Sequence, residues 1–139
     1  MSFLPVYLDA SALLKLVVAE RESEPLRTAL DRWPDRVSAS IVRVEVHRAL
    51  HRLGRPKAAH ALAETLLDGL VLVRVDEPIL ARAAAVKNPL LRPLDAIHLA
   101  AALSIGDDPA AFVTYDVRQA RAASAEGLTV LHPGIDRLS

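Results

Sequence analysis

The chain has 139 residues, of which 52% are hydrophobic, and it contains no cysteine. This length suits one compact domain over residues 1–139, and the lack of cysteine excludes a disulfide scaffold, a thiol nucleophile and a cysteine-ligated metal site. Because 17 basic residues balance 17 acidic ones, any site for a polyanion must be a local patch rather than a product of the overall charge.

Short apolar strands and amphipathic helices alternate along the sequence. In the first half, the pattern predicts a strand at 6–8, helices over 11–18 and 26–33, a weak strand at 36–39, and helices over 40–53 and 56–67. In the second half, it predicts a strand at 70–75, helices over 78–86 and from residue 93, a strand at 111–115, a helix over 117–125 and a strand at 128–131. We expect Ser11 to be the N-cap of the first helix.

This alternation predicts an α/β fold with a central, mostly parallel sheet flanked by helices, because continuous Val and Leu strands are typical of sheets covered on both faces. Ligands in such folds bind at the edge where the strands end. Asp9 and Asp116 each end a predicted strand and Asp95 begins a helix, so we expect three acids at this edge. The helix over 40–53 carries a fourth acid, Glu45.

The four acids point to a divalent cation. Two carboxylates about 4 Å apart repel by roughly 4 kcal/mol at an effective dielectric constant near 20, and no Lys or Arg is adjacent to Asp9 or Asp95 in the sequence. Oxygen ligands select Mg²⁺ or Mn²⁺ over Zn²⁺, and such ions activate water for phosphodiester cleavage without a protein nucleophile. The sequence therefore predicts a metal-dependent phosphodiester-cleaving enzyme.

Each acid alone also has an ordinary structural explanation. Asp9 and Asp116 suit turns at strand ends, and Asp95 suits the positive end of a helix dipole. Glu45 suits the solvated border of an apolar helix face. Only their joint placement favours a site.

Four local sequences around these acids resemble the motif regions of PIN domain nucleases, at residues 7–13, 40–50, 94–100 and 113–116. The size of the chain and the run Leu-Asp-Ala-Ile-His-Leu-Ala at 94–100 are most similar to VapC toxins of toxin–antitoxin pairs. The resemblance implies a three-layer PIN-like fold, Mg²⁺- or Mn²⁺-dependent cleavage of RNA, a homodimer, and inhibition by a VapB-type antitoxin.

The resemblance also assigns roles to six residues. The acidic positions that bind metal and act in catalysis are Asp9, Glu45, Asp95 and Asp116, and the polar supports are Ser11 and Thr114. One departure concerns the last motif, where many relatives carry a small residue before the acid and a basic one directly after it. Here Asp116 lies between Tyr115 and Val117, so its role is the least constrained of the four.

The helix over 40–53 carries the densest basic run in the chain. We expect a ridge that binds RNA, made of Arg43, His47, Arg48, His51 and Arg52. A solvated helix face is the ordinary alternative. His47 and His51 are also spaced like two zinc ligands, but the sequence shows no third ligand. We expect His98, one turn after Asp95, to pack in the core.

Other functions fit the sequence less well. A phosphate-binding receiver domain would need a Lys at the end of a late strand, and no Lys follows residue 87. A haloacid-dehalogenase-like phosphatase would need a second Asp two residues after Asp9, where Ser11 stands. The strongest alternative is a catalytically silent PIN-like module that binds only protein, and the complete acidic set argues against it.

We expect a cytoplasmic homodimer with no membrane contact. The longest uncharged stretch, residues 96–106, is about half of the roughly 20 residues that span a bilayer. No basic segment precedes Asp9, which interrupts the first apolar run, so the pattern of a secretory signal is absent. The apolar helices over 11–18 and 26–33 are expected to contribute to the dimer surface.

Overall fold

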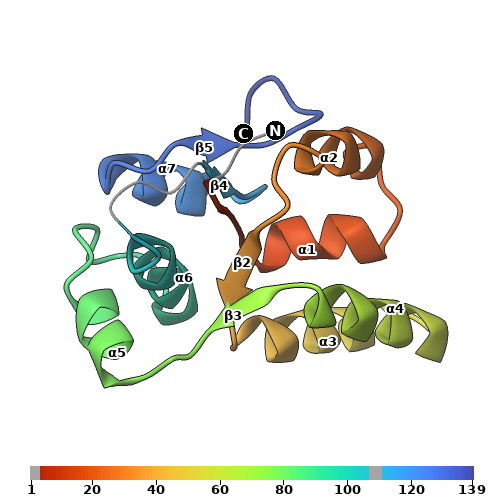
Figure 1. The fold of residues 1–139 in the computed structure, drawn as a ribbon, viewed down its shortest axis with the longest axis horizontal. Helices are drawn as coiled ribbons and strands as arrows, with labels where there is room; N and C mark the ends of the chain where they lie inside the picture. The colour runs from red at the N-terminus through yellow and green to blue at the C-terminus, as the bar shows by residue number, and fades with distance from the viewer. Residues whose placement is uncertain (1–3, 107–110) are drawn as a thin grey trace.

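The computed structural model describes residues 4–106 and 111–139 (Figure 1). Within these residues, five parallel strands form one sheet in the order β3-β2-β1-β4-β5. The strands are β1 (Val6–Leu8), β2 (Arg36–Ala39), β3 (Val71–Val73), β4 (Ala111–Val113) and β5 (Val130–Leu131). The predicted α/β fold with a central parallel sheet is confirmed.

Helices cover both faces of this sheet (Figure 1). One layer contains α1 (Ala10–Val17), α2 (Ser23–Leu30), α3 (Val42–Arg52) and α4 (Lys57–Asp68). The other contains α5 (Glu77–Ala84), α6 (Pro93–Leu103) and α7 (Val117–Ala125). None of the helices in the described part of the chain has the length and apolar character needed to cross a membrane.

The central strands β1 and β4 are apolar and buried because helices cover both faces of the sheet, whereas β2 also carries Arg36 and Ser38. Alternate side chains of a strand point to opposite faces. Val6 and Leu8 of β1 therefore pack with α1, α2, α3 and α4, whereas Tyr7 packs with α6 and α7. The Tyr7 ring also stacks on Phe112 of β4, with 5.2 Å between the ring centroids. The two resulting cores hold β1 and β4 firmly side by side at the centre of the molecule.

The starts of α1 and α2 differ from the prediction. Asp9, and not Ser11, is the N-cap of α1, because its side chain accepts a hydrogen bond from the amide of Ala12 at 3.1 Å. α2 lies three residues earlier than predicted. Pro25 belongs to its first turn, where the missing amide proton has no helical partner in any case. Trp33 is buried beyond the end of the helix, in the turn that leads to β2.

Candidate active site

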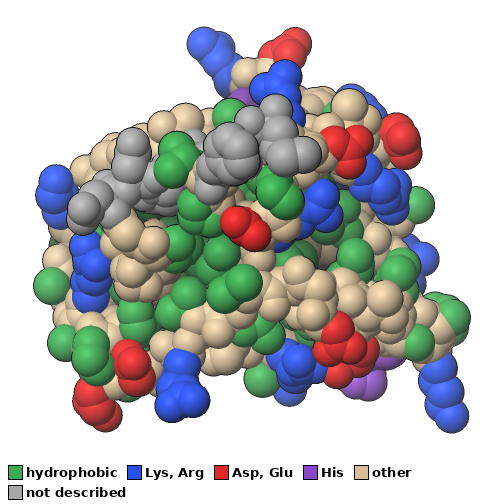
Figure 2. All heavy atoms as spheres, viewed as in Figure 1, with side chains coloured by type: hydrophobic (Ala, Val, Ile, Leu, Met, Phe, Trp, Pro, Cys, Tyr) green, Lys and Arg blue, Asp and Glu red, His purple; other side chains and the backbone are tan. Residues whose placement is uncertain are grey.

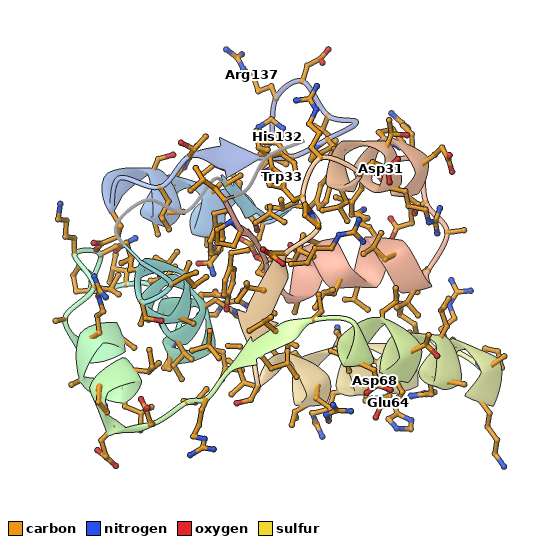
Figure 3. All side chains as sticks on the ribbon, in the orientation of Figure 1. Asp31, Trp33, Glu64, Asp68, His132 and Arg137 are labelled. Atoms are coloured by element: carbon orange, nitrogen blue, oxygen red, sulfur yellow. The ribbon has the colours of Figure 1, made fainter. Side chains whose placement is uncertain are left out.

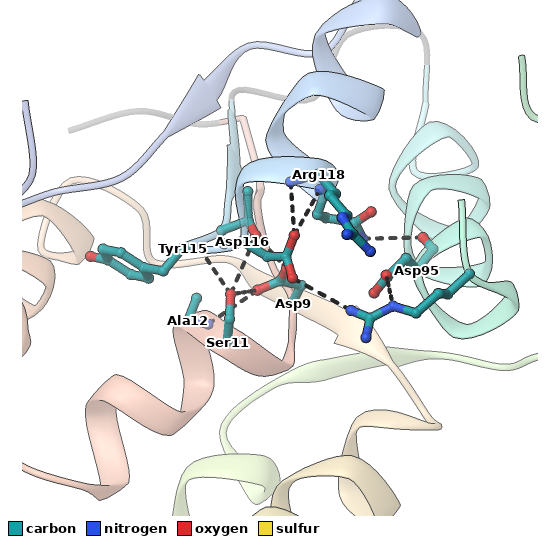
Figure 4. Close-up of polar contacts among 10 residues, drawn as sticks. Asp9, Ser11, Ala12, Asp95, Tyr115, Asp116 and Arg118 are labelled. Carbon is teal, nitrogen blue, oxygen red and sulfur yellow. Dashed lines mark hydrogen bonds and ion pairs between the residues drawn. The ribbon is translucent and has the colours of Figure 1, made fainter. Parts of the chain in front are cut away.

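A pocket of about 390 Å³ lies at the edge of the sheet where β1 and β4 end. Its walls come from the start of α1, one side of α3, the start of α6 and the start of α7. The lining includes all four predicted acids, Asp9, Glu45, Asp95 and Asp116. The structure thus brings together side chains that lie up to 107 positions apart in the sequence, from Asp9 to Asp116 (Figure 4).

Asp9 is the most deeply buried of these acids, with 4% of its surface exposed. One carboxylate oxygen, Oδ1, accepts hydrogen bonds from Ser11 Oγ at 2.6 Å and from the Ala12 amide. The other, Oδ2, accepts one from Thr114 Oγ1 at 2.5 Å. Burial raises the pKa of Asp9, while nearby His98 and the hydroxyl donors act in the opposite direction. The Asp9 carboxylate is therefore fixed in position, and its hydrogen bonds do not fully offset the cost of burying its negative charge.

The two predicted supports, Ser11 and Thr114, connect the ends of β1 and β4, with 3.3 Å between their hydroxyl oxygens. Figure 4 shows Ser11 between Asp9 and the backbone of Tyr115. Besides donating to Asp9, Ser11 Oγ accepts a hydrogen bond from the Tyr115 amide at 2.9 Å. Thr114 Oγ1 accepts one from the Asp116 amide at 3.1 Å. Each hydroxyl therefore has one partner on the carboxylate and one on the backbone of the β4–α7 connection, which fixes the geometry of this corner of the pocket.

Asp95 and Asp116 share a cation that the sequence analysis did not identify. The Arg92 guanidinium donates from Nε to Asp95 Oδ2 at 3.0 Å and from Nη2 to Asp116 Oδ2 at 3.4 Å. The other oxygen of Asp116 caps α7, accepting from the amides of Arg118 and Gln119. The spacing of three residues between Arg92 and Asp95 is a signal for their contact. The contact with Asp116 depends on tertiary structure alone.

Glu45 is held by a second feature that the sequence analysis missed. Its Oε1 lies 2.6 Å from Nε2 of His98, and His98 Nδ1 lies 2.7 Å from the hydroxyl of Tyr7. Burial raises the pKa of the Tyr7 hydroxyl well above its ordinary value, so this group is a neutral partner of Nδ1. In the neutral tautomer that carries its proton on Nε2, the His98 ring donates to Glu45 and accepts from Tyr7. His98 is buried, as predicted, and it also orients a carboxylate of the pocket.

A family model described as PIN domain matches residues 6–125. The chain belongs to the PIN domain family. Ribonuclease VapC47 of Mycobacterium tuberculosis (strain CDC 1551 / Oshkosh) is 39% identical to it over 136 residues, which cover 95% of the chain and 99% of that protein. Ribonuclease VapC46 of Mycobacterium tuberculosis (strain ATCC 25618 / H37Rv) is 42% identical over 128 residues, with 92% and 97% covered. This PIN domain is therefore a member of the VapC ribonuclease group.

Solved structures of toxins share this PIN domain fold. Mycobacterium tuberculosis VapC20, described as a toxin that cleaves the sarcin-ricin loop, superposes with a TM-score of 0.73 over 92% of this chain and 99% of its own, at 18% identity. A toxin–antitoxin complex from Klebsiella pneumoniae superposes with a TM-score of 0.69 at 22% identity, over 92% of this chain and 97% of the matched chain. VapBC2 from Rickettsia felis, bound to a promoter DNA fragment, superposes with a TM-score of 0.72 at 12% identity, over 93% of this chain and 98% of the matched chain. At these identities the superpositions bear on the fold alone.

In this PIN domain, the basic ridge expected on α3 is divided between two faces of the helix. Arg48 and Arg52 line the acidic pocket. The other three members, Arg43, His47 and His51, instead contact side chains of α4. Residues 48 and 52 are one turn apart, as are 43, 47 and 51, so each set follows one face. Only the first face can contribute charge to the pocket.

The pocket of this PIN domain suits a hard cation, although its carboxylates do not yet enclose one. Across residues 4–106 and 111–139, no three His, Cys, Asp or Glu side chains form a group that could hold a metal ion. The Arg92 guanidinium nevertheless shows that a positive group fits against Asp95 and Asp116. The other donors are carboxylate and hydroxyl oxygens, which Mg²⁺ and Mn²⁺ prefer. Metal entry would require Arg92 to leave at least one of its partners.

The raised pKa of Asp9 predicts that Asp9→Asn stabilises the metal-free protein. Folding is opposed when Asp9 ionises, because its pKa is higher in the folded chain than in the unfolded chain. The cost is absent below about pH 4, the ordinary pKa of Asp, and develops as the pH rises through the folded-state pKa. In EDTA at pH 7 we expect a gain of about 1 kcal/mol, measured by thermal unfolding, which shrinks towards pH 4.

Asp76→Asn is the matched control, because Asp76 caps α5 in the same way but is exposed. Asn is as good an N-cap as Asp, so this variant should show no comparable gain. A lower melting temperature for Asp9→Asn than for the wild type in EDTA at pH 7 would contradict the electrostatic account of the pocket.

Proposed function

We propose that this VapC-group PIN domain is a Mg²⁺- or Mn²⁺-dependent endoribonuclease. The observation that carries the proposal is the gathering of Asp9, Glu45, Asp95 and Asp116 around one pocket in a chain whose curated relatives are ribonucleases. A solvated or purely structural role for all four acids does not explain why they converge. A catalytically silent module that binds only protein is the alternative, and the loss of cleavage described below separates the two.

In the proposed mechanism, Asp9, Asp95 and Asp116 would hold the metal, together with Glu45. A bound Mg²⁺ or Mn²⁺ would supply an activated water and positive charge for the scissile phosphate. Ser11 and Thr114 keep Asp9 in place through their hydrogen bonds to its two oxygens. The activated water makes a protein nucleophile unnecessary. The hydroxyls of Ser11 and Thr114 instead donate their hydrogen bonds to Asp9.

His98 acts as a positioning residue in this mechanism. Its ring contacts the carboxylate of Glu45 through Nε2, and the Tyr7 hydroxyl holds the same ring through Nδ1. Arg92 has a second role once it leaves Asp116. Its side chain is 63% exposed at the rim of the pocket, so the released guanidinium is free to bind a phosphate of the RNA.

The biological role we propose is that of the toxin of a VapBC-type pair in the cytoplasm, with a VapB-type antitoxin as its partner and the whole chain acting as one PIN domain. The support is the identity to VapC ribonucleases and the similarity to a toxin–antitoxin complex. A homodimer is also proposed, on the family resemblance alone. The apolar sides of α1 and α2, which were expected to contribute to it, are buried in the chain's own core through Leu13, Leu16, Leu26 and Leu30.

We predict that Asp9→Asn and Asp95→Asn each lower metal-dependent RNA cleavage on the order of 100-fold or more, because each removes a charged metal ligand. Cleavage of a labelled RNA in Mg²⁺ or Mn²⁺ measures the effect, and circular dichroism verifies the fold. Asp76→Asn, at a residue that does not line the pocket, should keep full activity. If either pocket variant cleaves RNA as fast as the wild type, the substituted acid is not a metal ligand.

We also predict that RNA enters the pocket along Arg48 and Arg52. For a single strand, each phosphate contact contributes about −0.7 to the slope of log K against log salt. The double variant Arg48→Ala, Arg52→Ala should bind RNA more weakly and show a slope shallower by roughly one to two units. Affinity is measured at several salt concentrations with Ca²⁺ in place of the catalytic ion.

The control for this experiment is the double variant Arg21→Ala, Arg27→Ala, which removes the same charge from two exposed positions, one before α2 and one within it. Its slope should equal that of the wild type. If the pocket variant and the control give the same slope, the RNA follows another path over the protein.

A further inference from the structure

The helical hairpin formed by α3 and α4 carries a polar cluster whose side chains do not line the acidic pocket. It consists of His47 and His51 of α3 with His60 and Glu64 of α4, and we call it the hairpin cluster. Each helix contributes two side chains four positions apart, which lie one above the other on the same face of a helix. His47 therefore faces Glu64, and His51 faces His60, across the two neighbouring helices (Figure 1).

Contacts within the hairpin cluster are close. His47 Nε2 lies 2.9 Å from Glu64 Oε2, and His47 Nδ1 lies 2.7 Å from His60 Nδ1. The His60 ring is also 4.5 Å from the ring of His51, measured between centroids. Figure 3 shows Glu64 on the outer side of this hairpin, and Figure 2 shows histidine and acidic atoms side by side there. Three imidazoles and one carboxylate thus share a small region of the surface.

The hydrogen bonding of the hairpin cluster requires at least one neutral imidazole. A contact between two Nδ1 atoms needs a proton on one and a lone pair on the other, so His47 and His60 are not both protonated at these atoms. Desolvation, followed by the influence of His51 and His47, lowers the pKa of His60. Neutral imidazole is the form that binds metal ions.

We propose that the hairpin cluster is a binding site for a transition-metal ion of the Zn²⁺ class, with His47, His51, His60 and Glu64 as its ligands. Three imidazole nitrogens and one carboxylate oxygen are a ligand set typical of Zn²⁺, which is commonly four-coordinate. The two spacings of four residues supply two ligands from each helix. From the sequence only the pair on α3 is evident, because the partners on α4 come together with it only in the packed hairpin.

Binding requires side chains to turn while the helices stay in place. In the metal-free protein the donor atoms satisfy one another, and they do not surround one point, in keeping with the lack of a preformed group among the described residues. The ion would replace the hydrogen bond between His47 and His60, and the Arg43 ion pair with Glu64 would open. His51 is exposed and His60 is half-buried, so both rings have room to turn.

The proposed site is independent of the ribonuclease proposal and differs from it in chemistry. The acidic pocket offers oxygen atoms for a hard ion, whereas the hairpin cluster offers mainly nitrogen. An ion in the cluster would join α3 to α4. Since α3 also carries Glu45 and Arg48, the ion would secure the helix that forms one wall of the pocket.

The test is titration of the untagged full-length protein with Zn²⁺ by isothermal calorimetry, in a buffer with millimolar Mg²⁺ to occupy the acidic pocket. We expect one equivalent to bind. The variants His51→Ala and His60→Ala should each weaken binding at least tenfold, as the loss of a ligand does. With Co²⁺ as the probe, the wild type should give the visible absorption of a four-coordinate site, and both variants should lose it.

Two controls make the result specific. His132→Ala removes a histidine outside the hairpin, and Asp9→Asn disables the acidic pocket, so neither should change the affinity for Zn²⁺. Equal Zn²⁺ affinity in the wild type and in both hairpin variants would overturn the proposal, as would loss of binding in Asp9→Asn. His51→Asn tests the same point with a smaller change at an exposed position, and it should also weaken binding.

Discussion

Mutual repulsion among carboxylates at the end of β1 and β4 is the constraint on which the arrangement of this molecule depends. Four acids line one pocket, and each must be balanced by positive charge or by hydrogen-bond donors. Three of them stand at the beginnings of helices, where free amides and the helix dipole favour negative charge: Asp9 at α1, Asp95 at α6 and Asp116 at α7. Arg92 supplies the remaining charge between two of them.

This constraint explains why structural and functional interpretations of the same acids are compatible. Asp9 and Asp116 are N-caps, as a purely structural explanation requires, and each also faces the pocket. Capping uses Oδ1 in both residues, while Oδ2 of Asp116 binds Arg92 and Oδ2 of Asp9 binds Thr114. A single carboxylate can thus begin a helix and still offer an oxygen to a ligand. The fold and the site are consequently built from the same contacts.

The sequence predicted those features that depend on local pattern. Continuous apolar strands predicted the parallel sheet, and the positions of Asp9 and Asp116 at strand ends predicted their meeting at one edge. The contacts of Arg92 with Asp116, and of His98 with Glu45, were missed because they join segments 24 and 53 residues apart. The division of the α3 ridge was missed for a related reason. Two polar faces of one helix have similar residue types in the sequence, and only the packing of α4 shows which face is covered.

We propose that a divalent ion takes over the place that Arg92 occupies between Asp95 and Asp116. A crystal structure of the wild-type protein with Mn²⁺, analysed by anomalous diffraction, tests it directly. We expect an anomalous peak within coordination distance, about 2.2 Å, of oxygen atoms of both Asp95 and Asp116, with the guanidinium displaced from at least one of these carboxylates. A peak elsewhere, with Arg92 still bridging both acids, would contradict the account.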